Sequence, residues 1–470
     1  MEQTIASKMT GENTAVKAYF EEKRIYFDQG NTLPYAFRKE MLKKLKAGIQ
    51  EHEAEIVKAL NQDLRKSETE SFFTEIGVVK GEIDYALKNL SEWMKPKRRS
   101  TPLSFEPSKS ELRYEPRGVV LIIAPWNYPF NLLFDPLVGA IAAGNTVVLK
   151  PSEDAPATAA ITEKIISKLF KPEYVSVVQG SGSKVVSHLL KSHVFNHVFF
   201  TGSTEVGKII AKQAAENLVS VTLELGGKSP AIIDSSADLK VAAKRLVWGK
   251  FINAGQTCVA PDYLLVESKI KEKFTNVLIE TIKAFYGSDA QQSADYPRMI
   301  NEKRFDAVTA YLKDGNILFG GKSDKSDLFI EPTLMDNVDF ESSVMREEIF
   351  GPILPIIPFT DINQIFDIIR KNRYPLACYY FGTNKKHREL ILNRISFGGG
   401  CVNNTLLHLG SPELPFGGVQ TSGSGHYHGW HGFECFSHTK SLVISKTWFD
   451  AAIKYPPFNQ SKLSWLKKLI

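Results

Sequence analysis

Cysteine is scarce in this sequence. The chain has 4 cysteines among its 470 residues, and none of them is paired in a C-x-x-C motif. So few thiols do not build a disulfide framework. Reduced thiols are typical of the cytoplasm, so we expect a cytoplasmic protein without structural disulfides.

Long apolar runs and an excess of one charge are also missing. No stretch approaches the roughly 18 to 20 apolar residues of a membrane-spanning helix. The first ten residues, M-E-Q-T-I-A-S-K-M-T, lack the apolar centre of a signal peptide. The net charge of +6 is small for 470 residues, which argues against a nucleic-acid partner. The composition predicts a soluble protein of two or three domains.

Alternating apolar strands and helices follow Gly118. Apolar residues at four-residue spacing predict helices before that point, from residue 34 to about 60 and from about 70 to 93, after a frayed stretch at 1–14. The predicted strands are 118–124, 146–150, 174–178, 197–200, 219–223, 230–234 and 263–266, with helices near 156–169, 183–191, 204–216 and 238–252. Continuous apolar strands between helices predict an α/β fold with a parallel, doubly wound sheet. Its ligand is expected beyond the carboxyl ends of the strands.

One loop carries a candidate nucleophile. Small and polar residues surround Cys258 in F-I-N-A-G-Q-T-C-V-A-P-D-Y, which suits a tight loop that presents a thiol. Glu224 lies in T-L-E-L-G-G-K, and Asn127 lies in P-W-N-Y-P. A thiol, a carboxylate and an amide can share the work of acyl chemistry. Taken singly, the same residues also fit a buried apolar thiol, a buried carboxylate and a turn residue.

Together these motifs resemble the aldehyde dehydrogenase family. The strings F-I-N-A-G-Q-T-C, L-E-L-G-G-K-S-P and P-W-N-Y-P match its cysteine, glutamate and asparagine motifs, and E-E-I-F-G-P at 347–352 and P-F-G-G at 415–418 also match. The N-terminal helices are similar to those of the class 3 members. The resemblance implies an NAD(P)-dependent enzyme that converts aldehydes to acids through a cysteine thiohemiacetal and a thioester. Cys258 is then the nucleophile, Glu224 the base, and the Asn127 amide with the Cys258 N–H the oxyanion hole.

The cofactor segment differs from the usual dinucleotide fingerprint. There is no G-x-G-x-x-G after the first strand, but F-T-G-S-T-E-V-G at 200–207 joins a predicted strand to a predicted helix. Gly202 and Gly207 would let the backbone approach a ligand, and a helix N-terminus favours a pyrophosphate. Such turns are also common as plain connectors. The family resemblance makes Ser203 the pyrophosphate contact.

The resemblance assigns further residues to the cofactor. Lys150 and Glu153 would hold the adenosine ribose, Trp126 would line the nicotinamide cleft, Glu348 would hold the nicotinamide ribose, and Phe350 would lie beside the ring. A carboxylate at Glu153 fits a ribose 2′-hydroxyl and repels a 2′-phosphate, but class 3 members accept both cofactors with this residue present. The expected cofactor is therefore NAD or NADP.

The resemblance also predicts the domain organisation. We expect an NAD(P)-binding domain at 1–222, to which 100–116 adds part of a bridging β arm, a catalytic α/β domain at 223–418, and the rest of the arm with the C-terminal tail at 419–470. The alternating strand 440–446 has no obvious local partner. We expect it to join the segment 110–115 and to pair across a homodimer, because class 3 members exchange such a strand.

Three other features have competing interpretations. The stretch 426–438 offers His426 with His428, or Cys435 with His438, as zinc ligands, but its spacing is irregular and a packed turn without metal is favoured. Structural roles are favoured for Cys378 and Cys401. The C-terminal residues 461–470 predict a short amphipathic helix with a basic side. It would pack on its own dimer or make a weak membrane contact.

The substrate class rests on the subfamily resemblance alone. Class 3 members act on apolar aldehydes, of medium- or long-chain aliphatic or aromatic kind. Two alternatives remain: an enzyme of the same superfamily that transfers the acyl group to CoA, and a catalytically idle scaffold. The presence of Glu224 argues against the first, and the complete set of Cys258, Glu224 and Asn127 argues against the second.

Overall fold

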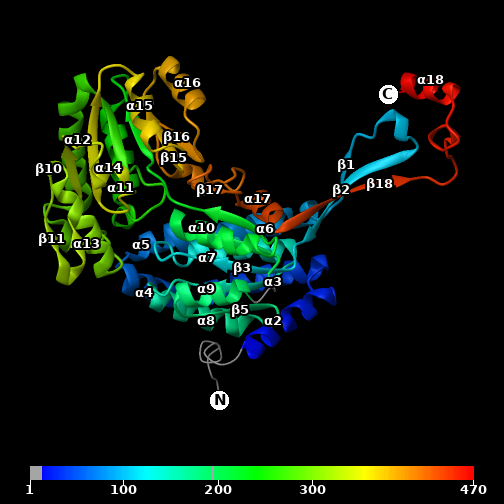
Figure 1. The fold of residues 1–470 in the computed structure, drawn as a ribbon. Coiled ribbons are helices and arrows are strands. Elements are labelled where there is room, and N and C mark those ends of the chain that lie inside the picture. The colour runs from blue at the N-terminus through cyan, green and yellow to red at the C-terminus, as the bar shows by residue number, and fades with distance from the viewer. Residues whose placement is uncertain (1–12, 192–194, 470) are drawn as a thin grey trace.

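The structure consists of two α/β bodies and a thin projecting arm (Figure 1). It is a computed structural model that describes residues 13–191 and 195–469. Most of the stretch predicted to fray, 1–14, lies outside the described residues, and its last two residues already belong to helix α2, which begins at Asn13. Within the described part of the chain, no helix is long and apolar enough to cross a membrane.

The first body is built on a six-stranded sheet with strand order β17-β7-β6-β3-β4-β5. Its strands are β3 (Val119–Ile123), β4 (Thr146–Lys150), β5 (Val175–Val177), β6 (His197–Thr201), β7 (Ser220–Glu224) and the short antiparallel β17 (Gly423–Ser424). The other pairs are parallel. Every residue of β3, β4, β5 and β6 is buried, as their continuous apolar sequences predict. The doubly wound α/β prediction is confirmed.

Helices pack around this sheet. They are α2 (Asn13–Asp28), α3 (Tyr35–Glu51), α4 (Glu53–Leu64), α5 (Glu68–Ser71), α6 (Gly77–Trp93), α7 (Asn131–Ala143), α8 (Pro156–Leu169), α9 (Gly182–Lys191) and α10 (Thr204–Ala215). The single apolar stripe predicted between residues 34 and 60 is divided at His52, whose backbone leaves the helical region with φ −103° and ψ 14°. The second predicted helix contains a π-helical segment, Phe72–Ile76.

The second body contains a seven-stranded sheet with order β10-β13-β14-β9-β8-β15-β16. Its strands are β8 (Pro230–Ile233), β9 (Tyr263–Glu267), β10 (Asn316–Phe319), β13 (Thr333–Asp336), β14 (Ile353–Phe359), β15 (Ala377–Phe381) and β16 (Gly399–Val402). Its helices are α11 (Leu239–Phe251), α12 (Lys271–Tyr286), α13 (Glu302–Ala310), α14 (Ser343–Arg346), α15 (Gln364–Lys371) and α16 (Lys385–Arg394), and β11 (Ser323–Asp324) pairs with β12 (Phe329–Ile330). Only the edge strand β10 is antiparallel to its neighbour.

The arm is a three-stranded antiparallel sheet that leads away from both bodies (Figure 1). Strand β18 (Ser437–Ser445) pairs with β2 (Ser108–Pro116) along its whole length, and β1 (Lys97–Arg99) pairs with the other side of β2. The prediction that 440–446 joins 110–115 is therefore confirmed. The arm begins after helix α17 (Gly429–Cys435), and helix α18 (Gln460–Leu469) lies near its far end. The domain boundary predicted after residue 222 falls within β7 and stays a prediction.

Candidate active site

The loop that presents Cys258 has an unusual backbone. After α11 ends at Phe251, Asn253, Ala254 and Gly255 all adopt positive φ values of 52°, 51° and 75°. A Cβ at Gly255 would lie 2.3 Å from the carbonyl oxygen of Gly351. Glycine is therefore required where the cysteine loop crosses the E-E-I-F-G-P segment. The two motifs, far apart in sequence, are held in direct backbone contact.

Asn127 is bonded to the same loop. It follows β3, is 2% exposed, and its Nδ2 donates to the carbonyl oxygen of Gln256 over 3.0 Å. In return, Nδ2 of Asn253 donates to the Asn127 carbonyl oxygen over 2.7 Å. The hydroxyl groups of Tyr128 and Thr257 lie 2.6 Å apart. The structure thus brings the asparagine and cysteine motifs together, as the sequence predicts.

A buried ion pair supports the asparagine motif from below. The side chains of Lys66 and Glu75 are fully buried and 2.5 Å apart. Lys66 Nζ also donates to the Asn127 carbonyl oxygen over 3.0 Å. Oε2 of Glu75 accepts from the backbone N–H groups of Phe130 and Asn131 over 2.9 and 3.0 Å. The pair therefore fixes the start of α7 and the loop before it.

A second carboxylate from the same region reaches the cysteine loop. Oε1 of Glu70 accepts a hydrogen bond from the backbone N–H of Asn253 over 2.9 Å. Burial raises the pKa of Glu70 to about 7, while the nearby Lys66 counteracts that rise. Sequence reasoning missed Lys66, Glu70 and Glu75. In the sequence these residues appear only as charged positions within and just before a predicted helix. Charged residues in helices are usually exposed to solvent, so the pattern does not indicate a buried role.

Glu224 is the last residue of β7 and lies in an apolar environment. It is 2% exposed, and both carboxyl oxygens are buried without a hydrogen-bond partner among the described residues. Burial raises the pKa of Glu224 well above its usual value. An unpaired carboxyl group of this kind is free to exchange a proton with a bound water.

The Cys258 thiol shares this environment. Burial is the largest cause that raises its pKa, and the nearby carboxylates of Glu348 and Glu224 add to the rise. The backbone N–H groups of Cys258 and Val259 act in the opposite direction, because they stabilise a thiolate. The structure thus brings Cys258, Glu224 and Glu348 together.

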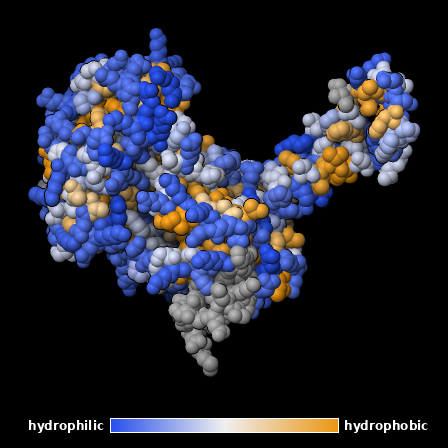
Figure 2. Space-filling view, in the orientation of Figure 1, coloured by the Kyte–Doolittle hydropathy of each residue, from blue (hydrophilic) through white to orange (hydrophobic). Residues whose placement is uncertain are grey.

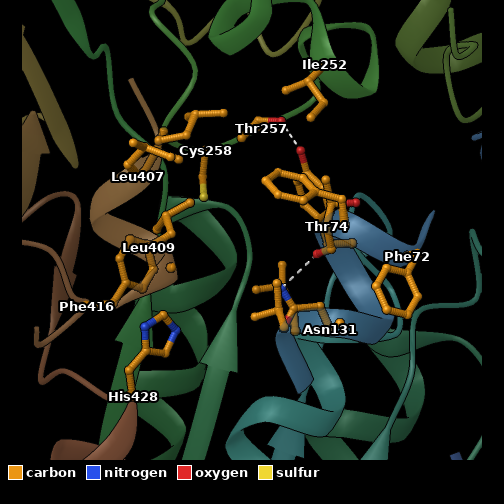
Figure 3. Close-up of a pocket in the computed structure, with 18 of the residues that line it drawn as sticks. Phe72, Thr74, Asn131, Ile252, Thr257, Cys258, Leu407, Leu409, Phe416 and His428 are labelled. Carbon is orange, nitrogen blue, oxygen red and sulfur yellow. Dashed lines mark hydrogen bonds between the residues drawn. The ribbon is translucent and has the colours of Figure 1, made fainter. Parts of the chain in front are cut away.

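The thiol opens into an apolar cavity of about 360 Å³. Figure 3 shows the Cys258 sulfur pointing into it, with Leu409, Phe416 and His428 on one side and Phe72 across from them. The other lining residues are Phe73, Thr74, Gly77, Val78, Tyr128, Asn131, Leu132, Trp248, Ile252, Thr257, Val259, Leu406, Leu407, Gly410 and Tyr427. A cavity of this composition favours an apolar ligand with a polar group at the thiol end.

The predicted pyrophosphate segment forms the start of α10. Ser203 is the N-cap residue, and its Oγ accepts from the backbone N–H of Val206 over 3.4 Å. The N–H of Gly202 donates to the carbonyl oxygen of Glu224 over 3.0 Å. A Cβ at Gly207 would lie 2.6 Å from Cδ2 of Leu225, so glycine lets this helix pack closely on the glutamate motif.

Lys150 and Glu153 lie beyond the end of β4. Lys150 is 1% exposed, and its Nζ donates to Glu153 Oε2 over 3.0 Å and to the Pro151 carbonyl oxygen over 2.7 Å. Oε1 of Glu153 accepts from the N–H of Gly182 over 2.6 Å. Burial acts to raise the pKa of Glu153, but the Gly182 N–H and Lys150 outweigh it, and the net pKa is lowered. The carboxylate is thus ionised and available to accept from a hydroxyl.

Trp126, Glu348 and Phe350 make up a second set of candidate cofactor residues, and of these Glu348 acts electrostatically on the Cys258 thiol. The rings of Trp126 and Phe350 meet edge to face with centroids 5.3 Å apart. The Glu348 carboxylate lies against Gly226, where a Cβ would be 1.9 Å from Oε2. Burial, then the charge of Asp262, raises the pKa of Glu348 to about 8.

These two groups fit a dinucleotide. Carboxylates at Glu153 and Glu348 are suited to accept from ribose hydroxyls, and the capped start of α10 at Ser203 offers backbone N–H groups to phosphates. The group of Glu153 and Ser203 lies at the carboxyl ends of β4 and β6, where open α/β sheets bind ligands. The residues present therefore suit NAD or NADP.

A buried lysine ties the glutamate motif to the neighbouring segments. Lys228 Nζ forms an ion pair with Asp262 and donates to the carbonyl oxygens of Val344 and Glu347 over 2.7 and 2.8 Å. Oδ1 of Asp262 accepts from the N–H of Ile349 over 3.1 Å. This network fixes the segment that presents Glu348.

One member of each zinc pair considered from the sequence has another contact. Nε2 of His428 lies 3.2 Å from Asp135 Oδ2. Sγ of Cys435 lies 3.1 Å from the Thr222 hydroxyl. The stretch expected to be a packed turn contains helix α17. Cys378 is buried in β15, as expected of a core thiol, and Sγ of Cys401 lies 3.6 Å from His408 Nδ1.

Comparisons with known proteins agree with this geometry. The sequence model described as the aldehyde dehydrogenase family matches residues 1–442. The 4,4'-diaponeurosporen-aldehyde dehydrogenase of Staphylococcus aureus is 45% identical over 96% of this chain and 98% of its own length. The dimeric NADP-preferring aldehyde dehydrogenase of Mus musculus is 42% identical over 94% of this chain and 98% of its own.

A solved structure has the same fold. The substrate-bound state of Staphylococcus aureus AldH superposes with a TM-score of 0.94 at 44% identity, and the match covers 96% of this chain and 99% of that one. The family model covers most of the sequence, and the relatives match it over nearly their whole length. The chain therefore belongs to the aldehyde dehydrogenase family and is an aldehyde dehydrogenase that depends on NAD or NADP.

Proposed function

We propose that this enzyme oxidises apolar aldehydes, of medium- or long-chain aliphatic or aromatic kind, to carboxylic acids. The observation that carries the proposal is the cavity of about 360 Å³, which is lined mainly by apolar side chains and has the Cys258 thiol in its wall. Burying an apolar chain there contributes about 0.8 kcal/mol per methylene group. The Staphylococcus aureus relative is named as a dehydrogenase of 4,4'-diaponeurosporen-aldehyde.

Cys258 acts as the nucleophile in this proposal. Its thiolate attacks the carbonyl carbon, a carbon–sulfur bond forms, and the carbonyl oxygen becomes an oxyanion. The Asn127 amide carries two N–H groups, and its bond to Gln256 uses one of them. The other N–H, with the backbone N–H of Cys258, is suited to stabilise the oxyanion.

Oxidation of the thiohemiacetal yields a thioester on Cys258. NAD or NADP, when bound, supplies the acceptor for the hydride that leaves the former carbonyl carbon. Ser203 would contact the pyrophosphate, with Gly202 and Gly207 allowing the approach, while Lys150 and Glu153 hold the adenosine ribose. The nicotinamide end would meet Trp126, Glu348 and Phe350.

Glu224 serves as the base for hydrolysis. Its carboxylate takes a proton from water as that water attacks the thioester carbon, and the carbon–sulfur bond then breaks to release the acid and the Cys258 thiol. The unpaired, buried carboxyl group supports this role, because a base that is already hydrogen-bonded would exchange its proton less readily. The same residue disfavours the rival reaction in which CoA replaces water.

We propose that the protein acts as a homodimer. Most residues of β18 are exposed, and its second edge is unpaired within the described chain. The second body offers two free sheet edges, β10 and β16. Pairing β18 of one subunit with such an edge of the other would satisfy both sets of backbone groups. One relative is named as dimeric.

Figure 2 shows orange, hydrophobic patches on the projecting arm. Large aromatic side chains are also exposed between β18 and the end of α18. Trp448, Phe458 and Trp465 are 76%, 67% and 62% exposed. We propose that α18 and the segment before it pack on the partner subunit of the dimer. A weak membrane contact through the lysines of α18 is the alternative.

The function is tested by a series of aldehydes of increasing chain length. NADH and NADPH formation is measured with each aldehyde, with and without CoA. We expect kcat/KM to rise with apolar chain length and the product to be the free acid. Preference for short polar aldehydes would contradict the substrate class, an acyl-CoA product would indicate the rival enzyme, and no reduced cofactor from any aldehyde would indicate an idle scaffold.

A further inference from the structure

Three potential metal ligands gather at the base of the arm. The ligand atoms of His426, His431 and Glu434 all lie within 4.8 Å of one another. His431 and Glu434 are three residues apart on helix α17 and therefore lie on one side of it. His426 comes from the turn before the helix, and its ring centroid is 4.9 Å from that of His431. None of the three belongs to the catalytic or cofactor groups.

One of these ligand atoms lacks a partner. Nδ1 of His431 is buried and makes no hydrogen bond within residues 13–191 and 195–469. Its distance of 3.8 Å to Glu434 Oε2 is too long for a hydrogen bond. A buried polar atom left in this state is unfavourable. A cation between the imidazole and the carboxylate would satisfy both groups.

We propose that His426, His431 and Glu434 bind a divalent transition-metal ion of the zinc type. Two imidazoles and one carboxylate form a donor set suited to Zn²⁺, with a fourth position open to water. Ligand atoms at roughly 2.0–2.2 Å from such an ion are about 3.4 Å apart. The longest separation must therefore shorten by about 1 to 1.5 Å, which the exposed side chain of His426 can supply by rotation.

The proposed metal site and the substrate cavity share one segment of the chain. Tyr427 and His428 lie between His426 and His431 in sequence, and both line the cavity. The turn is held in an uncommon conformation, with φ of 87° at Gly425 and 81° at His428. An ion bound at both ends of this turn would stiffen one wall of the cavity.

A neighbouring cation opposes metal binding and supplies a sharp test. Lys97 Nζ lies 3.1 Å from the centroid of the Trp430 ring, and Lys97 and the Glu434 carboxylate interact electrostatically. Lys97→Met removes this competing charge and keeps much of the apolar stem. We expect Lys97→Met to bind Zn²⁺ several-fold more tightly than the unaltered protein, because like charges repel.

The test is metal binding by the full-length, metal-stripped protein. Zn²⁺ binding is measured by calorimetry, and Co²⁺ is used as a spectroscopic probe, because thiolate ligands add a charge-transfer band that imidazole and carboxylate do not. We expect one equivalent of metal with no thiolate band. An ion held by Cys258 or another cysteine would show that band and would overturn the assignment.

Variants identify the ligands. His426→Ala should weaken Zn²⁺ binding at least tenfold, and His426→Ala with His431→Ala should abolish the site. The matched control is His438→Ala, which removes an exposed histidine of the same segment and should bind as the unaltered protein does. Circular dichroism of the metal-free proteins checks folding, and the exposed His426 variant alone decides the question if the double variant is unstable. Unchanged binding in His426→Ala would refute the proposal.

Discussion

At the scale of single residues, the role proposed for Glu224 separates the two halves of the reaction. Glu224→Gln keeps the shape but removes the base. We expect steady-state turnover to fall by about 10²–10⁴-fold, while a first turnover of NADH still forms and the enzyme then stalls as a thioester. Because the carboxylate also influences the thiol, the first turnover is expected to be slower. Stopped-flow measurement of the burst checks this. Unchanged steady-state turnover would exclude Glu224 as the base.

The raised pKa of Glu224 predicts a pH dependence. Burial stabilises the neutral acid, so the fraction in the basic form grows about tenfold per pH unit while the pH stays below its pKa. Where hydrolysis limits turnover, kcat should therefore increase as the pH rises toward the pKa of Glu224. The pKa of Cys258 is also raised. The rate of the first-turnover burst should therefore increase with pH as well.

Comparing the two phases distinguishes the groups. In Glu224→Gln, the burst rate should keep its dependence on pH. The residual slow turnover should lose the part of its pH dependence that arises from titration of the Glu224 carboxyl group. Both are measured from pH 6 to 9 on the same preparation. A flat profile for the unaltered enzyme would contradict the assignment of buried, proton-bearing groups to catalysis.

At the scale of elements, the buried pair of Lys66 and Glu75 positions the asparagine motif. Lys66→Met removes one partner and leaves the Glu75 charge buried, which should destabilise the fold by about 3–5 kcal/mol. Adding Glu75→Gln removes that charge, so the double variant should recover much of the stability. It still lacks the bond from Lys66 to the Asn127 carbonyl oxygen, and its kcat should stay low with a smaller effect on KM.

Thermal unfolding and steady-state kinetics on both variants provide the comparison. Lys80→Met is a suitable control, because Lys80 forms a partly exposed ion pair with Glu53 and such pairs contribute little. If kcat returns together with stability in the double variant, the pair has only a structural role.

The elements also show what the sequence could and could not predict. Strands β3, β4 and β6 fall where the apolar runs place them, because a fully buried strand has no alternative to continuous apolar side chains. The interruption at His52 leaves the apolar stripe intact on both sides and so is invisible to periodicity. The roles of Lys66 and Glu75 depend on partners 61 and 55 residues away, and no local pattern encodes such contacts.

The residues proposed as catalytic stand out in the sequence for a different reason. The chemistry requires particular residue types in tight loops, and those loops use glycine and asparagine where left-handed backbone is needed, as at Asn253 and Gly255. The wall of the cavity could not be predicted from the sequence, because its residues come from the π-helical segment Phe72–Ile76, α6, α7, α11 and the segment after β16. Only the folded chain brings these elements together.

At the scale of the whole molecule, the arm predicts the oligomeric state. An isolated three-stranded sheet with an unpaired edge and exposed aromatic residues is poorly stabilised on its own. We expect a dimeric mass by light scattering at micromolar concentration. Removing β18 and the tail by truncation after Phe436 should produce monomers or aggregates, and a monomeric mass for the complete chain would contradict the proposal.

The tail makes a separate prediction at this scale. A chain truncated after Gln460 lacks most of α18, whose exposed Leu463 and Trp465 are proposed to contact the partner subunit. We expect its dimer to dissociate more readily, and neither the complete nor the truncated chain to co-sediment with vesicles. Binding of the complete chain alone to anionic vesicles, weakened by salt, would instead establish the membrane contact.

The central claim is that Cys258 carries the acyl group. The most direct measurement is mass spectrometry of the intact protein, quenched in acid after one turnover with cofactor and a medium-chain aldehyde in the Glu224→Gln background. We predict a mass increase equal to the acyl group, located on the Cys258 peptide, and its complete absence after Cys258→Ala, although that variant still binds NADH. Cys401→Ala, a control that removes a different partly buried free cysteine, should acylate normally. An acyl group on another residue, or wild-type-like turnover by Cys258→Ala, would contradict the account.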